Sequence, residues 1–135
     1  LAISLHSAIQ SVREFLMPFS NKILIEDLID SLKYWINIKK SIITFEYIVF
    51  DGINDSETDI IELIKICKKI PSKVNLIQYN SINDDNFRNA SMKSINRYSK
   101  LLSENNIINT IRKSRGDDID AACGQLANNT LNLKN

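Results

Sequence analysis

Cys123 is the residue of this chain best placed by its neighbours to do covalent chemistry. It lies between Ala122 and Gly124, so no bulky neighbour along the chain shields its sulfur. A glycine also lets backbone approach a ligand closely. Cations precede the segment, at Arg112, Lys113 and Arg115. Together these features describe an accessible thiol in a loop of mixed charge, a setting in which a cysteine is either catalytic or idle.

The other cysteine, Cys67, stands beside Ile66 within an expected helix, where we predict a buried, unreactive thiol. The 2 cysteines are far apart and form no CxxC or Cys/His pattern, so we expect no metal site from within this chain. No apolar run reaches the roughly 18 residues that span a bilayer. We therefore expect a cytoplasmic protein with reduced thiols and no membrane partner.

The composition is that of an ordinary globular domain, with 44% hydrophobic and 24% charged residues. A net charge of +1 excludes a strongly electrostatic nucleic-acid binder, although it leaves room for RNA contact through a local patch. Arg112, Lys113 and Arg115 could form such a patch. They could equally pair with the acidic residues that follow them, and the sequence favours neither role; these are Asp117, Asp118 and Asp120.

Apolar runs alternate with helical patterns along the chain. We predict strands over residues 1–5, 42–50, 74–79 and 107–111. We predict helices over residues 22–39 and 91–104, and another from a cap at Ser56 to a stop before Pro71. This alternation predicts a parallel α/β sheet with crossover helices. The first strand starts at Leu1 without a turn or cap, so we expect the chain to be the C-terminal piece of a longer protein.

Polar residues follow these strands at their carboxyl ends, where parallel α/β barrels bind their ligands. Ser4, Leu5 and His6 end the first strand, residues 51–55 follow the second, and Asn80 follows the third. Each also has an ordinary explanation, since His6 can be a satisfied strand-end histidine and the others can be turn residues. The pattern by itself leaves their function open.

Several segments resemble the RlmN family of radical S-adenosylmethionine RNA methyltransferases, which methylate carbon 2 of an adenine. The resemblance is carried by residues 1–6 (LAISLH), 16–18, 45–47 with 51–55, 73–77 with Asn80, and the run 112–126 that contains Cys123. The segments occur in the family's order and cover nearly the whole chain. The resemblance implies that residues 1–135 form the C-terminal part of a partial (β/α)6 TIM-like barrel, with parallel strands and crossover helices.

The resemblance also implies roles for single residues. It makes Ser4, Leu5, His6 and Asn80 ligands of S-adenosylmethionine, clustered at one rim of the sheet, and it makes Cys123 the methyl carrier that passes the group to the base. A hydroxyl, a backbone amide and a side-chain amide can hydrogen-bond the ribose and methionine ends of that cofactor. The family's [4Fe–4S] cluster motif, CxxxCxxC, has no counterpart here. We therefore expect the cluster ligands outside this chain, and no activity from the chain alone.

The implied partners are 23S rRNA and tRNA substrates and a reductant such as flavodoxin or ferredoxin, with a monomeric full-length protein. Three alternatives stay open. A Cfr-like enzyme would methylate carbon 8, although the stretch 115–118 looks more like RlmN. A different radical S-adenosylmethionine enzyme would share the half barrel but not the ending 116–126. A non-catalytic α/β interaction module would explain the alternation of elements but not the ordered motifs.

Overall fold

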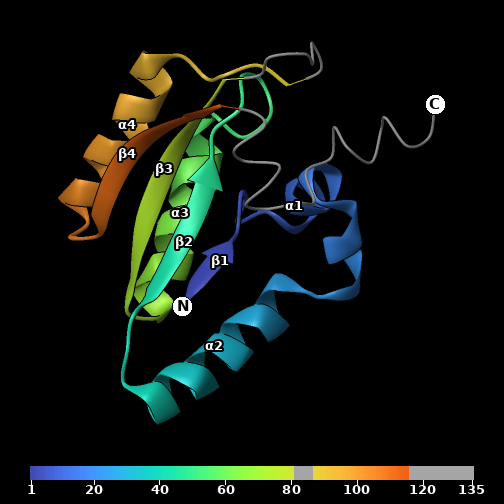
Figure 1. The fold of residues 1–135 in the computed structure, drawn as a ribbon, viewed down its shortest axis with the longest axis vertical. Helices are drawn as coiled ribbons and strands as arrows, with labels where there is room; N and C mark the ends of the chain where they lie inside the picture. The colour runs from blue at the N-terminus through green and yellow to red at the C-terminus, as the bar shows by residue number, and fades with distance from the viewer. Residues whose placement is uncertain (81–86, 116–135) are drawn as a thin grey trace.

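The computed structural model describes residues 1–80 and 87–115, and its centre is a four-stranded parallel sheet (Figure 1). The strands lie in chain order: β1 (Ala2–Ser4), β2 (Ile43–Ile48), β3 (Ser72–Asn80) and β4 (Ile108–Arg115). The connections hold α1 (Gln10–Leu16), η1 (Pro18–Lys22), α2 (Ile25–Lys39), α3 (Glu57–Lys69) and α4 (Met92–Glu104). The expected α/β class with parallel strands and helical crossovers is confirmed.

One face of the sheet is covered by helices and forms the main core. Alternate residues of the strands point to this face, because successive side chains of a strand point to opposite sides. Figure 1 shows α3 directly behind the sheet and α4 beside β4. The buried side chains that meet here include Phe45, Tyr47, Val74 and Leu76 from the strands and Ile29, Leu32, Leu63, Tyr98 and Leu102 from the helices.

The opposite face carries a smaller apolar cluster near the carboxyl ends of the strands. It joins the end of α1 to β2, β3 and the segment after residue 86, through Leu16, Met17, Ile48, Phe50, Ile77 and Phe87. Towards the amino end of β2 this face carries polar side chains. Glu46, two residues before Ile48, points to the same face as Ile48. A strand buried on both faces would be apolar throughout, so this change from apolar to polar side chains marks where the apolar cluster on this face ends.

Local sequence signals explain where the helices begin and end. The hydroxyl of Ser56 accepts from the amide of Asp59 at 3.2 Å, and Asp59 accepts in return from the amide of Ser56 at 3.1 Å. This capping box confirms the predicted start of α3. The helix α2 ends at Lys39, and the φ of 54° at the next residue, Lys40, lies in the left-handed region that often closes a helix.

Some boundaries differ from those that the sequence predicts. The region before α2 contains α1 and η1, which the apolar pattern does not reveal because both elements are short; α2 itself begins at Ile25. The last strand runs four residues further than expected, to Arg115, because its backbone stays paired with β3 up to Asn80. None of the helices in the described ranges is long and apolar enough to cross a membrane.

Candidate functional site

The segment that leaves β1, residues 4–6, is fixed by its backbone. The amide of Leu5 donates to the carbonyl of Glu46 on β2 at 3.0 Å, and so continues the parallel ladder. Arg13 on α1 donates through Nε to the carbonyl of Leu5 at 3.2 Å and through Nη2 to that of Ser4 at 3.4 Å. The side chain of Leu5 is buried in the helix-covered core. The backbone of this segment is thus held by both β2 and α1.

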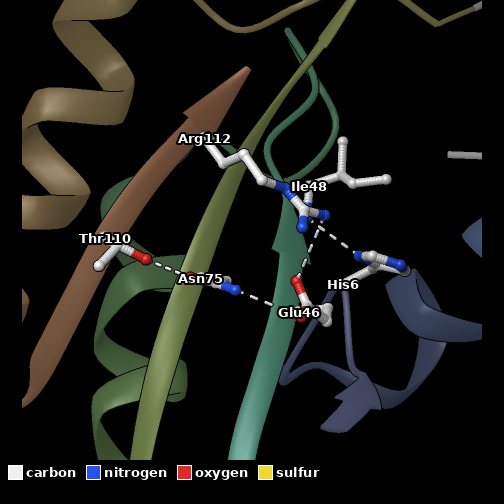
Figure 2. Close-up of polar contacts among 6 residues, drawn as sticks. All are labelled: His6, Glu46, Ile48, Asn75, Thr110 and Arg112. Atoms are coloured by element: carbon white, nitrogen blue, oxygen red, sulfur yellow. Dashed lines mark hydrogen bonds and ion pairs between the residues drawn. The ribbon is translucent and has the colours of Figure 1, made fainter. Parts of the chain in front are cut away.

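His6 is fully buried and has a defined tautomer. Its Nδ1 accepts a 3.0 Å hydrogen bond from the amide of Ile48 (Figure 2), so the proton of the neutral ring is on Nε2. Burial, and then the charge of Arg13, lowers the pKa of His6 to about 3. The Nε2 atom is buried and has no hydrogen-bond partner within the described residues. His6 therefore offers an N–H donor that none of the described residues accepts from, and no acid–base function near neutral pH.

Asn54 ties the end of β1 to the end of β2. Its Nδ2 donates to the carbonyl of His6 at 2.7 Å and to that of Ile48 at 2.8 Å. Its Oδ1 accepts from the amide of Phe50 at 2.7 Å. The side chain is completely buried, so all three bonds are shielded from water. The sequence places Asn54 among ordinary turn residues, whereas the structure shows that it braces the site.

A row of polar side chains crosses the face that the helices leave uncovered (Figure 2). Thr110 on β4 donates to Oδ1 of Asn75 on β3, and Nδ2 of Asn75 donates to Oε1 of Glu46 on β2 at 3.3 Å. Arg112 lies 3.8 Å from Oε2 of the same carboxylate. The register aligns Ser4, Glu46, Asn75 and Thr110 across the four strands. The row therefore begins beside the segment that holds His6.

The structure brings some of the predicted site residues together. Ser4, Leu5 and His6 are consecutive at the end of β1, and Asn80 ends β3 at the same carboxyl edge of the sheet. Ser4 is level with Asn75, so Asn80 lies five residues further along, roughly 16 Å in the strand direction. Cys123 and the acidic residues 117–120 lie outside the described residues.

Glu46, Asn75, Thr110 and Arg112 were not predicted as a group. Their signal in the sequence is alternation: polar residues occupy every second position of otherwise apolar strands, as Thr44 and Glu46 do in β2. The sequence could not show which strands are neighbours, and so it could not show that these positions align. The sequence leaves open whether Arg112 contacts RNA or the aspartates that follow it, and those aspartates lie outside the described residues. In the structure Arg112 lies beside Glu46.

The described residues suit one of the two groups that the resemblance implies and not the other. S-adenosylmethionine fits, because the buried Nε2 donor of His6 lies at the carboxyl edge of a parallel sheet and needs an acceptor atom. An iron–sulfur cluster does not fit the described part of the chain. No group of three or more histidine, cysteine or acidic side chains gathers there, and its cysteine, Cys67, is buried in α3.

Known proteins resemble the chain over almost its whole length. It is 51% identical over 131 residues to a probable dual-specificity RNA methyltransferase RlmN of Flavobacterium psychrophilum, covering 97% of this chain and 38% of the relative. A protein of the same name from Christiangramia forsetii is 52% identical over 128 residues, covering 95% and 36%. The chain thus spans little more than a third of the length of these relatives. No family model matches it.

One solved structure contains a part with the same fold as this chain. The crystal structure of a radical SAM methyltransferase from Sphaerobacter thermophilus aligns with a TM-score of 0.81 at 36% identity. The alignment covers 93% of this chain and 37% of that one. At this level of identity and overlap, the sheet and its helices correspond to part of that larger protein.

Proposed function

Because this chain belongs to the RlmN family of radical S-adenosylmethionine RNA methyltransferases, we propose that residues 1–135 form the C-terminal portion of the catalytic domain of such an enzyme. In this proposal an N-terminal RNA-binding domain and a loop that binds a [4Fe–4S] cluster belong to the rest of the full-length protein. Segment 4–6 and Asn80 contribute to the cofactor site, and Cys123 carries the methyl group.

The buried ring of His6 is the observation that supports a cofactor site most directly. A buried donor without a partner costs free energy, of the order of 1–3 kcal/mol, unless a ligand accepts from it. Within residues 1–80 and 87–115, Nε2 of His6 is such a donor, and Ile48 and Asn54 fix the direction in which it points. We infer that Nε2 donates to an acceptor atom of S-adenosylmethionine. In this proposal Ser4 contributes a hydroxyl, and Asn80, which ends β3 at the same edge of the sheet, contributes its amide. Leu5 places its neighbours through the ladder bond to Glu46.

Cys123 is the nucleophile of the proposed reaction. When bound, S-adenosylmethionine supplies the methyl group and the radical chemistry that an electron-poor sp² carbon requires. The thiolate of Cys123 accepts the methyl group and presents it to carbon 2 of an adenine. That base must leave its stack to reach the sulfur atom.

The names of the relatives support RNA as the substrate of the full-length protein, since both are called dual-specificity RNA methyltransferase. We propose 23S rRNA and tRNA as the two classes, which the resemblance implies. A one-electron reductant such as flavodoxin or ferredoxin would support the reaction. We propose a monomeric, cytoplasmic enzyme.

A chimera tests this function whatever precedes residue 1. The matching segment of the Flavobacterium psychrophilum relative is replaced by residues 1–135, and the purified chimera is given reductant, S-adenosylmethionine and rRNA or tRNA. Nucleoside mass spectrometry should find 2-methyladenosine in the RNA, and peptide mass spectrometry should find a methyl group on Cys123 and none on Cys67. A Cys123→Ala chimera that still methylates adenine would refute the assignment. Formation of 8-methyladenosine would show Cfr-like regiochemistry.

A further inference from the structure

The contact between Arg112 and Glu46 reaches across a whole strand. Arg112 on β4 is in register with Ile77 on β3, which is in register with Ile48 on β2. Glu46 lies two residues before Ile48 and so points to the same face. To place Nη2 3.8 Å from Oε2 of Glu46, the arginine side chain extends over β3, as Figure 2 shows. The contact therefore links β4 to β2 directly.

A second path joins the same two strands. Thr110, two residues before Arg112, is hydrogen-bonded to Asn75, which donates to the other oxygen of Glu46 at 3.3 Å. One carboxylate thus receives both connections from β4, each on its own oxygen. The side chain of Glu46 is only 19% exposed, so water screens these contacts less than it screens a surface ion pair. Glu46 therefore holds β4 at two points along its length.

Glu46 is also attached to the segment that holds His6. Its carbonyl accepts from the amide of Leu5 at 3.0 Å, and its Cα is in register with that of Ser4. At the opposite edge of the sheet, β4 is paired with β3 alone within the described residues. It ends at Arg115, eight residues before Cys123. One residue thus contacts both the segment at the candidate cofactor site and the strand that leads to the proposed methyl carrier.

We propose that Glu46 is a positioning residue that aligns β4, through Arg112 and the Asn75–Thr110 path, with segment 4–6. The alignment sets the point from which the chain continues to Cys123. This inference rests on the proposed function, because methyl transfer needs the sulfur at a fixed place relative to the cofactor, and that need is the reason for the alignment. A displacement of about 1 Å can slow an enzymatic step by as much as 100-fold.

The test compares this contact with an ion pair elsewhere in the chain. Glu46→Gln keeps the shape of the side chain and an acceptor for Asn75 but removes the charge that attracts Arg112. Arg112→Gln removes the same ion pair by changing its other partner, whose side chain is half-exposed. This variant keeps the test available if the Glu46 variant does not fold. The control is Glu57→Gln, which breaks the exposed pair between α3 and α4 in which Arg97 lies 2.5 Å from Glu57.

Two measurements are made on the chimera. Amide hydrogen exchange of residues 108–115 reports how firmly β4 is held, and single-turnover methylation of Cys123 reports its placement. Glu46→Gln and Arg112→Gln should each raise exchange in β4 and slow methylation, both on the order of tenfold, while the Kd for S-adenosylmethionine changes less than about twofold. The double variant should be no slower than either single one, because both remove the same interaction. Glu57→Gln should match the unsubstituted protein.

The possible failures are distinguishable. If Glu46→Gln leaves exchange in β4 unchanged, or if the two substitutions slow methylation additively, the positioning role of Glu46 is wrong. If the unsubstituted chimera places no methyl group on Cys123, the proposed function is wrong, whereas the exchange measurement still decides whether Glu46 holds β4.

Discussion

The carbonyl of His6 accepts a 2.7 Å hydrogen bond from the side chain of Asn54, which is 48 residues further along the chain. The same amide nitrogen donates to Ile48, the residue whose own amide donates to the ring of His6. The two strand ends are therefore locked by a closed set of buried bonds. The geometry of the candidate site depends on this set as much as on the residues that would touch a ligand.

Replacing Asn54 with alanine should destabilise the chain strongly. The substitution leaves the carbonyls of His6 and Ile48 and the amide of Phe50 without their partner, and each buried unsatisfied group costs about 1–3 kcal/mol. We expect the free energy of unfolding to fall by at least about 3 kcal/mol in urea titrations. Asn37→Ala, at an exposed position of α2, should change it by less than about 0.5 kcal/mol. Equal effects at the two positions would contradict the bracing role of Asn54.

His6 should make the stability of the chain depend on pH. Its pKa is about 3 in the folded protein and near 6.5 in an unfolded chain, so the unfolded state binds the extra proton between these values. Stability should be fully present above pH 6.5 and should fall as the pH drops, by up to about 1.4 kcal/mol per unit. Unfolding measured between pH 4 and pH 7 should lose this slope in His6→Asn. An NMR titration showing the ring protonated at pH 6 would disprove the assignment.

The two buried tyrosines should respond unequally to loss of their hydroxyls. Tyr98 donates to the carbonyl of Asn54 at 2.5 Å, so in the 3.0 Å contact between the tyrosine hydroxyls Tyr47 is the donor. Tyr98→Phe leaves two buried groups without a partner, whereas Tyr47→Phe removes only one donor. We expect Tyr98→Phe to cost roughly 1–3 kcal/mol more than Tyr47→Phe in chemical denaturation. The reverse order would mean that the hydroxyl protons are arranged differently.

Cys67 should be unreactive until the chain unfolds. Burial raises the pKa of its thiol to about 11, against a smaller opposite effect of the hydrogen bond with Ser72. Since the thiolate is the nucleophile, iodoacetamide at pH 7.5 should label Cys67 at least about 100-fold more slowly than a free cysteine. Labelling is followed by peptide mass spectrometry, with a urea-unfolded sample as the control. Rapid labelling of native Cys67 would show that α3 opens readily at this position.

The sequence predicted the parts of the fold that depend on local patterns. Apolar runs rich in β-branched residues located all four strands, and the Ser56 cap located the start of α3. The short α1 was missed because seven residues carry too little periodicity to stand out, and such a helix is stabilised mainly by tertiary contacts, here those of Arg13 and Leu16. The polar end of β4 has the sequence of a loop. It forms a strand because it pairs with β3, and no local pattern predicts this non-local contact.

The candidate site, like the fold, could be predicted from the sequence only in part. Ser4, Leu5, His6 and Asn80 could be placed at strand ends from the sequence, because parallel strands share one carboxyl edge. The contacts that brace them could not, since Asn54 and Glu46 act across 40 or more residues and through a register that no local pattern encodes. Turn-like and alternating polar residues acquire their role only when the strands are side by side.

The backbone of His6 has a consequence for directed evolution of this segment. Its φ of 58° is one that asparagine, aspartate and glycine tolerate, yet none of them can both accept from the amide of Ile48 and donate from the position of Nε2. Residues with rings of similar size, such as phenylalanine, would meet the backbone penalty and leave that amide unpaired. Few amino acids satisfy both demands. A randomised library aimed at altered ligand preference should therefore keep His6 constant and place its diversity at Ser4, where the chain is still extended.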